Sequence, residues 1–365
     1  MLLNIIYKDI SLINKQLLSG NLFGGVTAAI VALPLALAFG VQSGMGAIAG
    51  LYGAIALGIL AALFGGTPTQ ISGPTGPMAV VASAIIAGEI AIYGSLDAAL
   101  GTIIATFVLA GIIQIIMGIS RIGQYIRYMP YPVVSGFMSG IGLIIIIMQM
   151  FPFFGLSSPK TIIDVVSSLG DIFSSMNFQA VGLSMATIVI IYLFPYITKA
   201  IPSTLMALVV LSILSTLLGL HVPIIGDIPQ GLPDVHLDTL FAMDWHHPMV
   251  MIIPAVTLAA LGAIDSLLTS VVADNMTKTQ HNSNKELIGQ GIGNTISGLI
   301  GGLPGAGATM RTVVNINAGG KSKLSGVVHG LILLFVLLGA GAYAKLIPLP
   351  VLAGILITVG VGIID

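Results

Sequence analysis

Two charged side chains fall well inside the long apolar stretches of this sequence, Asp265 and Arg311. A charge in an apolar environment is costly, so its usual explanation is a functional one. Thr269 follows Asp265 by four residues, which places both side chains on one face of a helix. A carboxylate, a hydroxyl and nearby backbone carbonyls are the oxygen ligands that hard cations prefer. These residues predict a cation site, with a proton on Asp265 as the alternative.

Arg311 has three competing interpretations. It contacts a bound anion, it pairs with Asp265, or it reaches toward the cytoplasm beside Lys321. A mutual ion pair would be the purely structural explanation for two opposite charges in one apolar environment. It would also weaken the prediction of a cation site, because the Asp265 carboxylate would then already have a partner.

Two Gly/Pro-rich stretches interrupt the apolar pattern in matching places, Gly65–Pro68 and Gly301–Pro304. Each precedes a short segment, so each predicts a helix that begins inside the membrane. Such a helix presents unpaired N–H groups and a positive dipole end, and two facing ends make an anion site. The residues at these two helix starts are Thr75, Gly307, Ala308 and Thr309.

Composition identifies the class of protein. Of 365 residues, 56% are hydrophobic and 7% are charged, and the mean hydropathy is +1.08. A soluble domain carries about a quarter charged residues, so a cytosolic enzyme and a disordered chain are both excluded. The net charge of −1 gives no sign of a nucleic-acid partner, and the absence of Cys excludes disulfides and thiolate sites. No arrangement of residues suggests catalysis, so we expect no enzyme and no cofactor.

The apolar runs predict an all-α polytopic membrane protein in the lipid bilayer. The third and tenth of its segments are the Gly/Pro-interrupted ones, and they start on opposite sides of the membrane. This placement indicates an inverted repeat of seven plus seven spans. The twelve predicted segments are 22–41, 45–64, 70–88, 98–118, 132–151, 179–198, 202–220, 248–272, 286–302, 306–318, 324–344 and 350–364.

The positive charges predict the orientation. With the N-terminus in the cytoplasm, only two Lys or Arg side chains fall outside, Lys160 and Lys345. We therefore expect a multi-pass protein of the cell (inner) membrane, with residues 1–21 as a cytoplasmic or interfacial segment. We also expect His329, near the start of its span, to lie at the interface. The positive side chains placed inside are Lys8, Lys15, Arg121, Arg127, Lys199, Lys278, Lys285, Lys321 and Lys323.

A series of motifs makes the chain resemble the SulP family of anion permeases, and within it the bicarbonate-transporting branch. The resemblance runs from about residue 20 to the end, and 265–320 is its most specific part. The motifs are Leu22–Ala28, Ala32–Gly40, Gly65–Pro77, Ser270–Asp274 and His281–Gly291.

The resemblance implies a seven-plus-seven inverted-repeat transporter fold with a core and a gate. The core would comprise about 22–118 and 248–344, and the gate about 132–220 and 350–365, all within a transmembrane domain of 22–365. Family members have two further spans and usually a soluble STAS domain, for which this chain has no counterpart. The resemblance leaves open whether the protein forms a homodimer.

The resemblance also implies roles for individual residues. Asp265, Thr269, Gly307 and Thr309 match sodium-site positions, and Thr75, Ala308 and Thr309 match anion-site positions. The function implied is sodium-coupled bicarbonate symport, with sodium as the coupling ion and no metal site beyond it.

Arg311 favours an alternative, because many sulfate- and chloride-type members carry Arg at this position. The alternative is a proton-coupled sulfate or dicarboxylate permease with Arg311 on the anion. An anion channel or a non-transporting membrane scaffold is the alternative from another class.

Overall fold

Each of the twelve predicted segments corresponds to a helix in the structure. This computed structural model describes residues 15–126, 131–159, 161–198, 201–226, 233–236 and 248–364. Among the described residues, five short helices that were not predicted stand between the main ones: α6 (Gly123–Ile126), α8 (Met150–Phe153), α9 (Ile162–Ser167), the 3-10 helix η1 (Leu169–Asp171) and α10 (Ile172–Ser175). The main helices are α2 (Lys15–Ser43), α3 (Ala47–Phe64), α4 (Gly76–Tyr93), α5 (Leu96–Ile119), α7 (Tyr131–Met148), α11 (Phe178–Ile197), α12 (Ser203–Leu217), α14 (Pro248–Thr277), α15 (Ser283–Leu299), α16 (Thr309–Asn317), α17 (Lys323–Ala344) and α18 (Leu349–Ile363).

The described residues hold six helices long and apolar enough to cross a membrane: α2, α3, α4, α5, α11 and α14. Helix α2 begins at Lys15, so it starts within the segment expected at the interface. Residues 1–14 lie outside the described residues, as do four positive residues of the orientation argument, Lys8, Arg127, Lys160 and Lys199.

The two Gly/Pro-interrupted segments begin later than predicted. The expected segments 70–88 and 306–318 become α4 from Gly76 and α16 from Thr309. Each helix is preceded by a two-residue strand, β1 (Ser72–Gly73) before α4 and β2 (Ala306–Gly307) before α16. Pro77 lies in the first turn of α4, where its missing N–H costs no helical hydrogen bond.

Local capping residues define several other helix ends. The Ser95 side chain accepts from Ala98 N at the start of α5, and the Asn282 side chain accepts from Lys285 N at the start of α15. Helix α4 ends at Gly94, whose φ of 84° is left-handed and therefore favours glycine. These caps fix the positions at which the spans turn.

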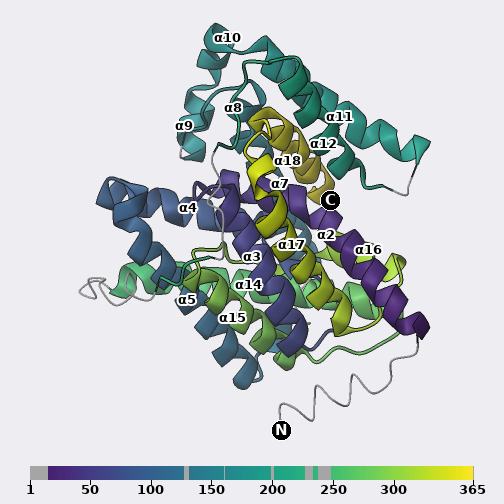
Figure 1. Ribbon diagram of the computed structural model, residues 1–365. Coiled ribbons are helices and arrows are strands. Elements are labelled where there is room, and N and C mark those ends of the chain that lie inside the picture. The colour runs from purple at the N-terminus through teal and green to yellow at the C-terminus, as the bar shows by residue number, and fades with distance from the viewer. Residues whose placement is uncertain are drawn as a thin grey trace.

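The helices pack in two groups (Figure 1). In the larger group, α15 packs on α5 and α3, α17 packs on α3 and α2, and α14 packs on α5. In the smaller group, α18 packs on α7 and α11, and α11 packs on α12. Helices α9 to α12 lie at one end of the view, away from α5 and α15. The two groups meet where α18 contacts α2 and α4 contacts α7.

Candidate ion-binding site

Helices α4 and α16, called the half-helices because the sequence predicts that each begins inside the membrane, meet through a short antiparallel strand pair. Ser72 pairs with Gly307 and Gly73 pairs with Ala306. Because each strand leads into its helix and the strands run in opposite directions, α4 and α16 leave the pair in opposite directions. Their N-terminal ends therefore lie next to each other. The sequence predicted facing helix ends, but it did not predict the strands that hold them together.

Small residues allow the two backbones to approach this closely. A Cβ on Gly305 would run into the Gly73 carbonyl, so any larger residue at position 305 would push the strands apart. Gly307 is enclosed in the same way, because its Cβ would meet the Gln70 side chain. Glycine is thus required by close approach at both positions.

The half-helix starts lack side-chain caps. Thr75 and Ala308 are the N-cap residues of α4 and α16, and neither makes a side-chain cap hydrogen bond. Threonine often caps a helix, but here the Thr75 hydroxyl donates to Asp265 Oδ2 at 2.8 Å. The first-turn N–H groups of both helices are therefore left without side-chain acceptors, and their dipoles favour an anion.

Helix α14 supplies the oxygen atoms that face the crossing, which is the place where strands β1 and β2 bring the starts of α4 and α16 together. Asp265 is 7% exposed and Thr269 is fully buried one turn further on. The Thr269 hydroxyl donates to the Gly307 carbonyl at 3.0 Å and shares a hydrogen bond of 2.7 Å with the Thr309 hydroxyl. Thr309 itself is exposed. The structure thus brings together one carboxylate, two hydroxyls and a backbone carbonyl beside the two helix starts.

Ser266 is a site residue that the sequence did not single out. Its hydroxyl accepts from Gly307 N at 3.0 Å and donates to Gly262 O at 2.6 Å. It therefore fixes strand β2 against α14 while the Gly307 carbonyl stays turned toward Thr269. Its position directly after Asp265 is the one signal in the sequence that points to it.

Arg311 lies behind the crossing and does not pair with Asp265. No ion pair within 4.0 Å joins these two side chains, both of which the structure describes. The Arg311 side chain is 2% exposed, so it does not reach the cytoplasm either. Its Nη2 donates to the Pro74 carbonyl, and its Nη1 has no hydrogen-bond partner among the described residues. In this structure Arg311 therefore makes neither a direct ion pair with Asp265 nor a contact with solvent.

A buried carboxylate that was not predicted supports the loop before β1. Glu286 is 1% exposed, and among the described residues its four hydrogen bonds come from neutral donors. Its Oε2 accepts from the backbone N–H groups of Gly66 and Thr67, both at 2.8 Å. Its Oε1 accepts from the side-chain amides of Gln70 at 2.9 Å and Gln290 at 2.8 Å. The predicted span began at residue 286, which placed this carboxylate at the membrane edge instead of inside.

The Glu286 cluster reaches β1 directly. Gln290 Nε2 also lies 2.6 Å from Ser72 Oγ, and Ser270 Oγ donates to Gln70 Oε1 at 2.9 Å. Helices α14 and α15 therefore hold strand β1 and the loop before it in place through polar contacts. This network positions the start of α4 without facing the candidate site.

The expectation for His329 was wrong. The side chain is fully buried within α17, and neither ring nitrogen has a hydrogen-bond partner in the part of the chain that the structure describes. A Cβ on Gly58 would lie 2.6 Å from His329 Nδ1, so α3 covers the imidazole closely. Packing of α17 on α3 and α2 draws the start of the span inside the protein.

The whole sequence can also be compared with families of known proteins. The model of the family described as Sulfate permease family matches residues 18–365. The chain belongs to the sulfate permease family. The resemblance stated from the sequence motifs is thereby confirmed for nearly the whole chain.

Within the sulfate permease family, two relatives share about half of their residues with this chain. The bicarbonate transporter BicA of Picosynechococcus sp. is 49% identical over 356 residues, which is 95% of this chain and 62% of that protein. The bicarbonate transporter BicA of Synechocystis sp. is 52% identical over 352 residues, again 95% and 62%. The chain thus spans less than two thirds of the length of these relatives.

A solved structure of this family gives the same fold. The transmembrane domain of a cyanobacterium bicarbonate transporter BicA aligns with a TM-score of 0.91 at 50% identity. The alignment covers 97% of this chain and 91% of that chain. The prediction of an all-α polytopic membrane protein with the inverted-repeat transporter fold is confirmed.

Proposed function

We propose that this chain is the membrane part of a secondary active transporter that carries bicarbonate together with sodium. The observation that carries the proposal is the meeting of two uncapped helix starts with the oxygens of Asp265, Thr269, Gly307 and Thr309. The similarity to BicA proteins along 95% of the chain supports bicarbonate as the anion.

Sodium would be held by the carboxylate of Asp265, the hydroxyls of Thr269 and Thr309, and the carbonyl of Gly307. These are oxygen ligands of the kind that hard cations take. The Asp265 charge would otherwise repel an anion at the adjacent helix starts. Sodium binding neutralises that charge, so the anion binds best after the cation, and this order couples the two ions.

The anion would lie at the starts of α4 and α16, against Thr75, Ala308 and Thr309. Backbone N–H groups and two dipole ends supply its binding energy. The small side chain of Ala308 leaves the backbone of α16 open to a close approach. Transport then requires that this site be exposed to the two sides of the membrane in turn.

Movement of a core against a gate would provide that exposure. The larger helix group comprises α2 to α5 and α14 to α17, and it carries every proposed ion ligand. The smaller group, α7 to α12 with α18, would be the gate. We place the protein in the cell (inner) membrane with the N-terminus in the cytoplasm, where the positive-inside pattern puts it.

Uptake by proteoliposomes tests the proposal. The full-length protein is reconstituted, and labelled bicarbonate and sulfate are offered with and without an inward sodium gradient. We expect sodium-stimulated, saturable bicarbonate uptake. Bicarbonate uptake that is indifferent to sodium would reject the sodium site, and the absence of bicarbonate uptake would reject the substrate.

A proton-coupled sulfate or dicarboxylate permease is the second candidate. It is favoured by the buried Arg311 Nη1, which has no hydrogen-bond partner among the described residues and lies where a Cβ on Gly73 would be only 2.7 Å away. A doubly charged anion would benefit most from this guanidinium. Sulfate uptake driven by a proton gradient and lost in Arg311→Gln would establish this candidate in place of the first.

An anion channel and a non-transporting scaffold make different predictions. A channel dissipates an anion gradient and never accumulates the anion against it. A scaffold is insensitive to Thr75→Ala and Thr309→Ala. Gradient-driven accumulation that is lost in these variants excludes both.

A further inference from the structure

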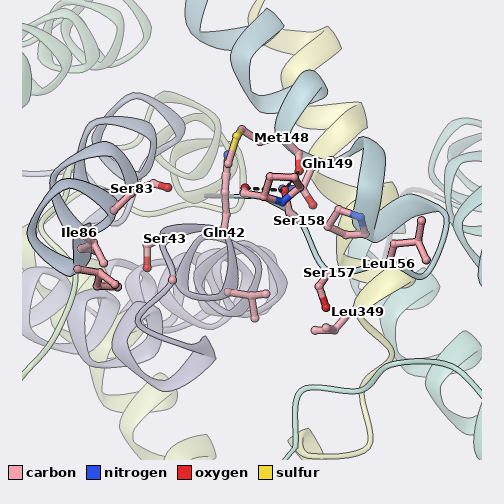
Figure 2. A pocket seen from close by; sticks show the side chains of 16 residues that line it. Gln42, Ser43, Ser83, Ile86, Met148, Gln149, Leu156, Ser157, Ser158 and Leu349 are labelled. Atoms are coloured by element: carbon pink, nitrogen blue, oxygen red, sulfur yellow. Dashed lines mark hydrogen bonds between the residues drawn. The ribbon is translucent and has the colours of Figure 1, made fainter. Parts of the chain in front are cut away.

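A cavity of about 260 Å³ lies where the two helix groups meet, apart from the proposed ion site. On one side its wall is formed by the end of α2 and by α4, with Gln42, Ser43 and Ser83. On the other side it is formed by the α7–α8 junction and the segment that follows, with Gln149 and Ser158 (Figure 2). The remaining lining residues are Val41, Gly44, Ile86, Ala87, Ile90, Met148, Pro152, Leu156, Ser157, Pro159 and Leu349.

The Gln42 side chain in this wall lacks hydrogen-bond partners. Both its Nε2 and its Oε1 are buried, and neither atom bonds to a residue that the structure describes. A buried carboxamide without partners is unusual, because each unmade hydrogen bond costs about 1–3 kcal/mol. Both atoms have almost no accessible surface, so a rotation of the Gln42 side chain would be needed to turn this unused donor and acceptor into the cavity.

Among the residues that the structure describes, the cavity wall carries no ionisable side chain. Its polar groups are two carboxamides and four serine hydroxyls, and all of them are neutral. The hydroxyls of Ser43 and Ser158 already donate to backbone carbonyls, so the carboxamides and the two other serines are the side chains left to donate to an anion. A wall without charge would hold an anion less tightly than a charged one, as a site on a transport path requires.

A thin apolar layer separates the cavity from the start of α4. A Cβ on Gly76 would lie 2.9 Å from the Ile145 side chain, 3.2 Å from that of Ile363 and 3.8 Å from that of Phe39. Gln42 follows Phe39 by about one helical turn along α2, and Gln149, directly after the end of α7, follows Ile145 by about one turn. Along both helices the polar cavity is therefore followed by the apolar layer. Gly76, the residue next to Thr75, lies beyond that layer.

We propose that this cavity is a waiting site for the transported anion and that Gln42 makes it selective for an oxyanion that carries one proton. The inference rests on the proposed function and adds a second binding site to it. Bicarbonate has an O–H group beside its charged oxygens, so it can donate to Gln42 Oε1 while it accepts from Gln42 Nε2. Sulfate is fully deprotonated at neutral pH and leaves the Gln42 carbonyl facing a negative oxygen.

Protection of a single thiol tests binding in the cavity without requiring transport. The 365 residues contain no Cys, so Ser83→Cys introduces one thiol into the cavity wall. Its rate of reaction with a small methanethiosulfonate reagent is measured with bicarbonate, with sulfate and with neither, in the full-length protein with any later Cys replaced. Ser174→Cys, on exposed α10, is the matched control.

We expect bicarbonate to slow the labelling of the Ser83→Cys thiol about tenfold at saturation, and sulfate at the same ionic strength to leave it unchanged. The control thiol should react at one rate throughout. Equal protection by both anions, protection by neither, or a cavity thiol that never reacts would overturn the proposal.

Uptake kinetics test the role of Gln42 itself. Gln42→Met keeps the volume and removes both amide atoms, while Gln124→Met changes an exposed amide on α6 as the control. We expect Gln42→Met to raise the KM for bicarbonate about tenfold, the effect of one lost hydrogen bond to a charged ligand, with kcat and inhibition by sulfate unchanged.

Two results would overturn the selectivity. One is a Gln42→Met variant that behaves like Gln124→Met, and the other is an equal loss for bicarbonate and sulfate, which indicates a packing role. If the unmodified protein takes up no bicarbonate, the proposed function fails instead, and the thiol assay still reports on the cavity.

Discussion

The hydroxyl of Thr75 lies 2.8 Å from Oδ2 of Asp265, and this hydrogen bond joins the N-cap of α4 to the middle of α14. It has two effects at once. It orients the carboxylate toward the crossing of the half-helices, and it removes the threonine hydroxyl from the capping role that it usually has. The carboxylate of the proposed cation site and the helix end of the proposed anion site are therefore directly connected.

Removing the charge of Asp265 should abolish coupling. In Asp265→Asn the amide carbonyl can still accept from Thr75, so the local structure is retained while the cation loses its one charged ligand. We expect sodium stimulation of uptake to fall about tenfold or more, measured with labelled bicarbonate in proteoliposomes. Asp97→Asn, in the exposed first turn of α5, is the control. Wild-type sodium dependence in Asp265→Asn would refute the cation site.

Thr75 should tune sodium affinity through its hydrogen bond. Thr75→Ala removes the donor to Asp265, and we expect the half-saturating sodium concentration to rise about tenfold, as for one hydrogen bond to a charged group. Thr75→Ser keeps the hydroxyl and should restore most of the affinity. The measurement is uptake rate against sodium concentration. If Ala and Ser variants are alike, the hydroxyl is not the group that matters.

Glu286 should be a stabilising residue. Glu286→Gln replaces an acceptor by an N–H₂ group that faces backbone or amide donors, so we expect a loss of about 2–3 kcal/mol in unfolding free energy. The melting temperature in detergent would show it. Glu89→Gln is the contrasting change, because Glu89 is buried and its Oε2 has no partner. We expect no loss of stability there, and equal melting temperatures for both variants would contradict this role.

The strand crossing should not tolerate a side chain at residue 305. Gly305→Ala directs a methyl group at the Gly73 carbonyl, and we expect it to destabilise the protein by about 1–3 kcal/mol through overpacking. Gly339→Ala, in α17 with nothing within 4 Å of the added Cβ, should be neutral or stabilising. Thermal unfolding of both variants checks the difference. A Gly305→Ala protein as stable as wild type would mean that the strands can separate at no cost.

The helices and the position of the site could be predicted from the sequence for simple physical reasons. Long apolar runs define spans, and the Gly/Pro stretches before Thr75 and Thr309 define interrupted ones. Asp265 and Thr269 are separated by one helical turn, so their common face follows from helix geometry alone.

Long-range contacts could not be predicted. Nothing near Ser72 in the sequence indicates Gly307 as its partner, and two-residue strands carry no periodicity. The role of Glu286 could not be predicted, because its four donors come partly from a loop far away in the chain. His329 was misplaced because burial near a helix start depends on neighbouring helices, and a sequence pattern does not contain them.

The strand pair also has a consequence for how the protein is made. Arg311 and Pro74 are 237 residues apart in the chain, and the contacts around them close the crossing. During synthesis the first half-helix is inserted long before its partner exists. The candidate site therefore assembles only after α16 has been made, and a chain interrupted before α16 has only one of the two facing helix starts.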